Sequence, residues 1–241
     1  MSETINAKDR LIFALDLPDR EAAEGLVRSL EGVVSFFKIG MELYLSAGPD
    51  FAKLMIKRGK RIFLDLKFYD VPETVQLAVA AASAIGVEFL TVHGNGRIMS
   101  AAIAGKKRDT LKILAVTVLT SLDQDDLNEL GYPCSVPDLV LHRARKAKAI
   151  GLDGVIASGE EAARIRNAVG EEFLIVSPGI RPGGASLNDH KRPTTPRKAV
   201  LSGSDYLVVG RPIRDAEIPR DAALEIAREM QLAFDERGMR I

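Results

Sequence analysis

Two carboxylates and an ammonium group lie close together in residues 62–74, a segment that begins as an apolar run and ends with charges. Asp65 and Lys67 are two residues apart, and Asp70 follows them. Because the side chains of a strand alternate between its faces, Asp65 and Lys67 point the same way. Opposite charges on the inward face of a buried strand are costly unless they pair. Alone, this spacing fits a structural ion pair about as well as it fits catalysis.

The composition indicates one globular core and no global charge. Of the 241 residues, 46% are hydrophobic, and an α/β barrel typically takes about 250 residues as one domain. The 33 Lys and Arg residues balance 33 Asp and Glu residues. A formal net charge of zero gives no field that would attract nucleic acid or an anionic membrane, so we expect neither as a partner. A local basic pocket is compatible with this balance.

The sequence gives little support for a disulfide, a metal site or a Ser-His-Asp catalytic triad. Cys134 is the only cysteine, which rules out an intrachain disulfide and a metal site built from cysteines. The histidines, His93, His142 and His190, lie on different segments. A magnesium ion at Asp65 would be opposed by the neighbouring lysines. We therefore predict no metal site and no Ser-His-Asp arrangement.

The chain shows no targeting or spanning segment. Its first ten residues lack the apolar core of a signal peptide. No apolar run reaches the roughly 20 residues that cross a bilayer. We therefore expect a soluble, cytoplasmic protein.

Short apolar runs alternate with segments of helical spacing. The runs predict buried strands at residues 11–16, 33–40, 62–68, 87–94, 111–119, 154–158, 173–177 and 206–209. The intervening segments predict helices at 18–30, 51–57, 78–85, 98–104, 123–131, 136–150, 160–169 and 196–202, with a final helix ending near 234. Residues 183–193 have little apolar content and predict a flexible loop.

This alternation favours a parallel (β/α)₈ barrel, the TIM-barrel fold of the α/β class, with residues 1–241 forming a single domain. A doubly wound open sheet is the alternative. Such a sheet often carries Gly-x-Gly-x-x-Gly after its first strand, whereas this chain has only Gly94-Asn95-Gly96 after its fourth. A dinucleotide site is therefore poorly supported.

Polar residues interrupt the apolar runs at their carboxyl ends, where a barrel of this type holds its active site. They are Asp16, Lys38, Asp65, Lys67, His93, Thr120, Ser158 and Arg181. A structural ion pair would not need matching interruptions in several strands, so their convergence predicts a functional site. For His93, a hydrogen bond at a strand end is favoured over catalysis, and Ser158 has the residue type of a helix cap.

The last predicted strand ends in Gly210-Arg211. Loops after the seventh and eighth strands of such barrels commonly bind phosphate. Glycine permits close approach of the backbone, and arginine supplies a fork of donors, to which Arg181 could add a second. A solvated loop arginine is the alternative, but the position favours a phosphorylated small molecule as ligand.

The chain resembles the bacterial orotidine 5′-phosphate decarboxylases over essentially its whole length. The motifs that carry the resemblance are Ala14-Leu15-Asp16, Phe37-Lys38-Ile39-Gly40, Asp65-Leu66-Lys67-Phe68-Tyr69-Asp70-Val71-Pro72-Glu73-Thr74, Val118-Leu119-Thr120-Ser121, Pro178-Gly179-Ile180-Arg181-Pro182 and Val209-Gly210-Arg211-Pro212. Together they are specific to that family, whereas Asp-x-Lys-x-x-Asp alone is shared with related phosphosugar barrels.

This resemblance implies a carboxy-lyase that converts orotidine 5′-monophosphate (OMP) to UMP and CO₂ in pyrimidine biosynthesis, without a cofactor. Loss of CO₂ leaves a carbanion at C6 that no ring orbital delocalises. By analogy, Lys67 stabilises this charge and protonates C6. Asp65 and Asp70 flank Lys67 and hold its ammonium group in place, and Lys38 completes an alternating charge network.

The resemblance also implies the substrate contacts. They are Asp16 and Lys38 at the ribose, Thr120 and Ser121 near the pyrimidine, and Arg181, Gly210 and Arg211 at the phosphate. Asp70 and Thr74 match residues that reach the site of a neighbouring subunit, which implies a homodimer with shared active sites. His190 stands where many relatives carry a loop glutamine that bridges phosphate and base, and a histidine there has a shorter reach.

Two other functions compete with this interpretation. A metal-dependent phosphosugar lyase or epimerase of the same superfamily would use an acidic metal ligand from the second strand, where this chain has Lys38. A non-catalytic barrel that binds a phosphorylated ligand would have no evident need for the charged residues around Lys67.

Overall fold

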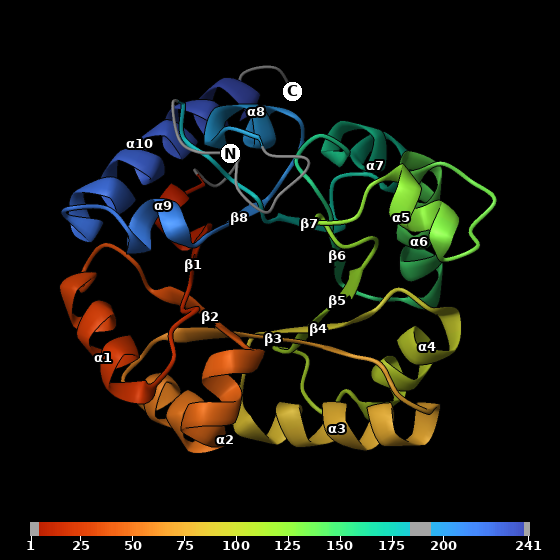
Figure 1. Cartoon of the computed structure of the whole chain (residues 1–241), viewed down its shortest axis with the longest axis horizontal. Helices are drawn as coiled ribbons and strands as arrows, with labels where there is room; N and C mark the ends of the chain where they lie inside the picture. Colours follow the sequence, from red (N-terminus) through yellow and green to blue (C-terminus); the bar gives the residue numbers. More distant parts are fainter. Residues whose placement is uncertain (1–4, 184–193, 239–241) are drawn as a thin grey trace.

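Eight parallel strands close into a barrel that is ringed by helices (Figure 1). The computed structural model describes residues 5–183 and 194–238 of the chain. The strands are β1 (Leu11–Ala14), β2 (Phe36–Gly40), β3 (Arg61–Phe68), β4 (Phe89–His93), β5 (Lys112–Val116), β6 (Gly154–Ile156), β7 (Leu174–Ser177) and β8 (Tyr206–Val209). Each strand pairs with the next in sequence, and β8 pairs with β1. The predicted (β/α)₈ barrel is confirmed, and the open-sheet alternative is wrong.

Helices surround the barrel, and all but η1, α9 and α10 lie between successive strands in the chain (Figure 1). They are η1 (Ala7–Asp9), α1 (Arg20–Ser29), α2 (Met41–Lys57), α3 (Pro72–Ile85), α4 (Gly96–Gly105), α5 (Gln124–Glu129), α6 (Val136–Ile150), α7 (Ala162–Val169), α8 (Pro196–Leu201), α9 (Arg211–Arg214) and α10 (Pro219–Gly238). The short extra helix predicted at 123–131 is α5. Across the described residues, no helix has both the length and the apolar character needed to cross a membrane.

The helix after β2 differs from its predicted range. It begins at Met41 instead of near Phe51, directly after the strand. Gly48 has φ 70° and ψ 178°, so two helical pieces meet at a kink before Pro49. A Gly-Pro pair is a turn signal in sequence, and it conceals the first helical piece. The final helical region is likewise divided into α9 and α10.

Two apolar layers hold the barrel together. A small cluster inside the barrel includes Phe36, Phe63, Phe89 and Tyr206. The rings of Phe36 and Phe89 meet edge to face, with centroids 4.9 Å apart, a geometry that aromatic pairs prefer. A larger cluster lies between the strands and the helices. Because each strand is covered on both faces, its sequence is a near-continuous apolar run.

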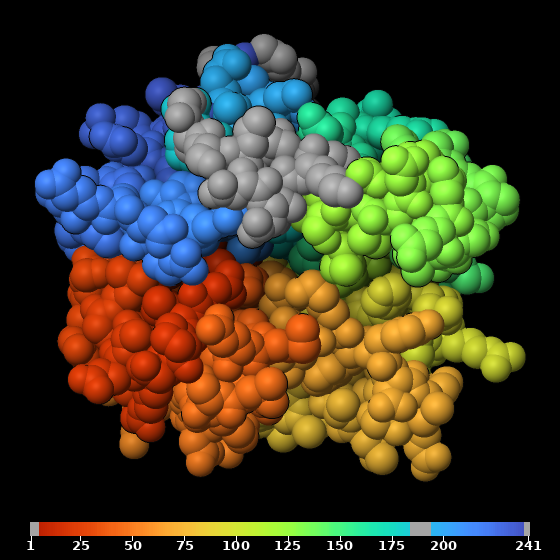
Figure 2. Space-filling view, in the orientation of Figure 1, coloured from red at the N-terminus to blue at the C-terminus, as the bar shows by residue number. Residues whose placement is uncertain are grey.

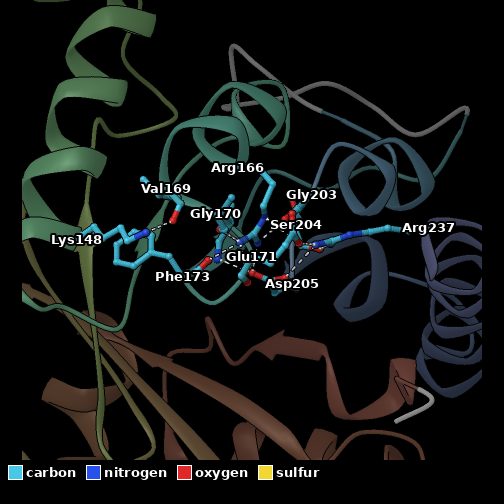
Figure 3. A network of polar contacts seen from close by, with 11 residues as sticks. Lys148, Arg166, Val169, Gly170, Glu171, Phe173, Gly203, Ser204, Asp205 and Arg237 are labelled. Atoms are coloured by element: carbon cyan, nitrogen blue, oxygen red, sulfur yellow. Dashed lines mark hydrogen bonds and ion pairs between the residues drawn. The ribbon is translucent and has the colours of Figure 1, made fainter. Parts of the chain in front are cut away.

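A buried arginine organises the amino ends of β7 and β8, opposite the carboxyl ends of the strands (Figure 3). The Nη1 group of Arg166 donates to the carbonyls of Gly170, Glu171 and Phe173, at 2.6, 3.0 and 2.8 Å. Its Nη2 group donates to the carbonyl of Gly203 at 2.8 Å and to Asp205 at 2.5 Å. One side chain therefore ties together the two loops that lead into these strands.

The two ends of the described chain lie side by side. Figure 2 shows the red surface around α1 meeting the blue surface of α9 and α10 on one face of the molecule. Arg214 donates to the carbonyl of Asp16 at 3.1 Å, and Arg220 donates to the carbonyl of Glu31. These bonds reinforce the β1–β8 pairing that closes the barrel.

Candidate active site

A cavity of about 540 Å³ lies at the carboxyl ends of the strands. Its apolar lining comes from residues such as Ala14, Phe63, Val116, Ile156 and Val208. Its polar lining consists of Asp16, Lys38, Asp65, Lys67, Thr120, Arg181, Gly210, Arg211 and Arg214. The volume is within the range of about 300–1,000 Å³ that small-molecule sites occupy. The cavity therefore joins an apolar inner surface to a strongly charged one.

Charges of alternating sign run across the cavity. The Nζ atom of Lys38 lies 2.9 Å from Oδ1 of Asp16 and 3.7 Å from Oδ2 of Asp65. The Nζ atom of Lys67 lies 3.0 Å from Oδ1 of Asp65. Asp65 thus lies between two ammonium groups. The side chains of Lys38 and Asp65 are 11% and 14% exposed, so these two charges are paired where water is scarce.

The backbone at Lys67 departs from regular strand geometry. Lys67 has φ 49°, and the pairing of β3 with β4 shifts register between Leu64 and Phe68. The buried hydroxyl of Thr91 accepts the N–H of Lys67 at 2.9 Å and donates to Asp65 at 2.9 Å. One side chain of β4 therefore holds both the irregular backbone and the carboxylate beside Lys67.

Gly40 leaves room for the pair formed by Lys38 and Asp16. A Cβ atom at Gly40 would lie 3.1 Å from Nζ of Lys38 and 3.2 Å from Oδ1 of Asp16. Both distances are tighter than ordinary van der Waals contact. The end of β2 therefore supplies a cation and, two residues later, the space in which that cation meets its partner.

Guanidinium groups gather at the ends of β7 and β8. Arg181 is largely buried, and its side chain donates to the carbonyl of Ile180 at 2.8 Å. Its backbone N–H donates to the carbonyl of Thr194 at 2.9 Å, which fixes this part of the chain. Arg211 and Arg214 line the same side of the cavity near Gly210. This arrangement suits an anion with several oxygen atoms, such as a phosphate group.

Some predicted site residues lie away from this cavity. Asp70, Thr74 and Ser121 are exposed and do not contribute to its lining. The carboxylate of Asp70 accepts the N–H of Val71 at 2.6 Å instead of meeting Lys67. His190 lies outside the described residues. Within one chain, the ion pairs therefore link Lys67 to Asp65 and Lys38 to both Asp65 and Asp16. They do not extend to Asp70.

The other two polar interruptions are also outside the cavity lining. Ser158 accepts the N–H of Glu160 at 3.3 Å, just before α7, so its hydroxyl has a local backbone role. His93 ends β4 and its ring faces that of Tyr69, with centroids 4.5 Å apart. Burial, with a smaller effect of Arg143, lowers the pKa of His93.

Sequence reasoning missed Thr91 and Arg214. Thr91 is a hydroxyl in an apolar run, but its importance depends on the irregular pairing of β3 with β4, which has no clear sequence signal. Arg214 is three residues beyond Arg211, one helical turn away. A predicted helix starting at Arg211 would have placed both side chains on one face.

The described parts of the chain contain no group of three or more His, Cys, Asp or Glu side chains that could hold a metal ion. The site instead offers positioned ammonium groups next to carboxylates, and guanidinium groups that line the same cavity. Such a site can stabilise negative charge that develops on a bound ligand and can donate a proton from Lys67.

The sequence and structure are both similar to known proteins. Residues 9–226 match the model of the family described as "Orotidine 5'-phosphate decarboxylase / HUMPS family". Orotidine 5′-phosphate decarboxylase of Nitrobacter winogradskyi is 52% identical over 224 residues, covering 93% of each chain. The protein of that name from Methylococcus capsulatus is 50% identical over 236 residues, covering 97% of this chain and 96% of its own.

A solved structure gives the same result. The crystal structure of orotidine 5′-phosphate decarboxylase from Lactobacillus acidophilus superposes with a TM-score of 0.81 at 38% identity. The match covers 91% of this chain and 98% of that one. Sequence and fold agree, and the chain belongs to the orotidine 5′-phosphate decarboxylase / HUMPS family.

Proposed function

We propose that this protein decarboxylates OMP to UMP and CO₂ and so acts in pyrimidine biosynthesis, as a single catalytic domain of residues 1–241 in the cytoplasm. The names of its similar relatives support this activity. The observation that carries it is the row of alternating charges in the cavity, from Asp16 through Lys38 and Asp65 to Lys67.

In the proposed reaction, the bond from C6 of the pyrimidine to its carboxylate breaks and CO₂ leaves. The electron pair stays on C6, and a proton moves from the ammonium group of Lys67 to that carbon. Lys67 then regains a proton from solvent. Asp65 holds Nζ of Lys67 at 3.0 Å, so the cation is already oriented when negative charge develops.

The cavity offers separate groups to each part of the nucleotide. Arg181, Gly210 and Arg211 would bind the phosphate. Asp16 and Lys38 would bind the ribose hydroxyls, and Thr120, with Ser121 beside it, would lie near the base. The anchoring of the distant phosphate supplies binding energy that can orient the reacting ring over Lys67.

We further propose a homodimer in which Asp70 and Thr74 complete the site of the neighbouring subunit. Asp70 is exposed and lies between two large exposed side chains, Tyr69 (64% exposed) and Val71 (60% exposed). Exposed apolar side chains around a charged residue suit a surface that a second protein covers. In the dimer, the Asp70 carboxylate of each subunit would lie close to Lys67 of the other subunit.

The metal-dependent lyase or epimerase remains the competing function within the superfamily. The presence of Lys38 on β2, paired with Asp16 and Asp65, disfavours it, because a cation occupies the place of an acidic ligand.

The assay follows the ultraviolet absorbance of OMP with purified protein, with and without EDTA. We expect OMP to be consumed at equal rates in both samples. No loss of OMP in any ordinary buffer would refute the proposal, and activity that requires added magnesium would favour the competing function.

A further inference from the structure

Two aromatic rings meet beside the active site without lining its cavity. Tyr69 follows β3, and His93 is the last residue of β4. Their ring centroids are 4.5 Å apart and the rings are tilted by 37°. Because the Tyr69 residue is 64% exposed, little else in this chain covers it. The contact with His93 is therefore well placed to decide where Tyr69 lies.

His93 is held firmly by the barrel. It pairs with Val116 of β5, and the next residue, Gly94, donates its N–H to the carbonyl of Val116 at 3.0 Å. A Cβ atom at Gly94 would lie 2.5 Å from that carbonyl oxygen, so the chain passes tightly against β5 here. The lowered pKa of His93 favours a neutral ring at neutral pH, which suits packing against another aromatic ring.

Tyr69 reaches His93 because β3 is irregular. After the register shift, Phe68 pairs with Val92, so the next residues of the two strands are Tyr69 and His93. The positive φ of Lys67 is part of the same irregularity. The backbone that places Lys67 in the cavity thus also delivers Tyr69 to the ring of His93, at the start of the loop that carries Asp70.

We propose that His93 is a positioning residue that fixes Tyr69 and, through it, the Asp70–Thr74 segment for use in the neighbouring subunit's site. This inference rests on the proposed function and on its shared site. His93 does not line the cavity. It acts from one subunit on the chemistry of the other, because the loop that it orders is donated across the interface.

A double-mutant cycle tests the contact. We expect His93→Ala and Tyr69→Ala each to lower kcat/KM by about 3- to 10-fold, the range of one aromatic pair. The kcat/KM of the double variant should be no lower than that of the less active single variant. His93→Phe, which keeps a ring, should retain most of the activity. His142→Ala, an exposed histidine on α6, is the matched control and should behave as wild type. Additive losses in the double variant would overturn the inference.

Subunit mixing tests whether the effect crosses the interface. Excess Lys67→Ala, itself inactive, is added to His93→Ala. In the hybrid, the intact Lys67 of the His93→Ala subunit receives a loop ordered by a wild-type His93. We expect activity per His93→Ala subunit to rise to the wild-type value per site when an inactive protein is added. An effect confined to the subunit's own barrel would give no rise.

The controls separate this inference from the proposals beneath it. An inactive wild type would refute the decarboxylase function, and failure of Lys67→Ala to complement Asp70→Ala would refute the shared site. If both of those hold, and hybrids form by native mass spectrometry without any rise in activity, the positioning role of His93 alone is wrong. A defect that disappears at high protein concentration would also overturn it, because the pair would then act on subunit association.

Discussion

Lys67 has a backbone conformation that few residues other than glycine adopt, with φ 49°. Such conformations cost on the order of 1–3 kcal/mol and persist only where the surroundings hold them. Thr91 holds this one, since its hydroxyl bonds both the N–H of Lys67 and the carboxylate of Asp65. Thr91 therefore aligns the two charges on which the proposed reaction depends.

Replacing Thr91 with Val tests this alignment, because valine keeps the shape and removes the hydroxyl. We expect a loss of about 1–3 kcal/mol in the free energy of unfolding, since a buried N–H and a carboxylate lose a partner. We also expect kcat to fall by about tenfold, because Lys67 and Asp65 are no longer held in register. Urea unfolding and the OMP assay measure the two effects.

Thr91→Ser is the control, since it keeps the hydroxyl at the same position. It should retain most of the stability and turnover. A Val variant with wild-type stability and turnover, beside a defective Ser variant, would show that the methyl group, and not the hydrogen bonds, matters.

The charged residues of the cavity could be predicted from sequence, but their supports could not. Asp16, Lys38 and Asp65 interrupt apolar runs where a parallel barrel exposes strand ends, so each stands out alone. Thr91 acts through a neighbouring strand whose register shifts beside it. A shift of this kind is a property of two paired strands, and neither sequence shows it separately.

At the level of elements, the two ends of the barrel have different tasks. The carboxyl ends carry the cavity, whereas the amino ends of β7 and β8 are tied by Arg166 (Figure 3). Burial raises the pKa of Asp205, with Arg166 and Arg237 acting in the opposite direction. The ionised carboxylate therefore depends on these arginines for its stability inside the protein.

Arg166→Met should cost about 3–5 kcal/mol of unfolding free energy, because it leaves Asp205 buried without its main partner. Asp205 then prefers its protonated form in the folded state, and the unfolded state binds fewer protons. The destabilisation should therefore grow as pH rises above the ordinary carboxyl value of 3.8. Urea titrations at several pH values measure it.

Arg164→Met, on the same helix, removes an exposed ion pair with Asp138. Its cost should stay below about 1 kcal/mol. Similar losses for the two variants would contradict the special role of the buried network.

The strands were predictable because a strand covered on both faces has few polar residues. The start of α2 was not, because the Gly48-Pro49 signal that usually marks a turn lies inside a kinked helix here. The division between α9 and α10 was missed although Pro219, the first residue of α10, marks it in the sequence, because a proline favours the first position of a helix.

At the scale of the whole molecule, one chain leaves Asp70 and Thr74 exposed and outside the cavity. If a second copy supplies these residues, two inactive variants should complement each other. Mixing Lys67→Ala with Asp70→Ala makes hybrids that contain one site with both residues intact. At random mixing, we expect on the order of a quarter of the wild-type activity.

Subunit exchange in that mixture is checked by native mass spectrometry. Hybrids that form and remain inactive would contradict a shared site. Activity of the Asp70→Ala variant equal to wild type would contradict any role for that carboxylate.

We propose that Lys67 supplies the proton and the positive charge for loss of CO₂. Turnover of OMP by Lys67→Ala, measured beside its affinity for UMP, tests this most directly, with Lys53→Ala as an exposed lysine control. We predict a fall in kcat of at least about 10³-fold with UMP binding still measurable, because the phosphate and ribose contacts remain. Near-normal turnover by Lys67→Ala would contradict this role of Lys67.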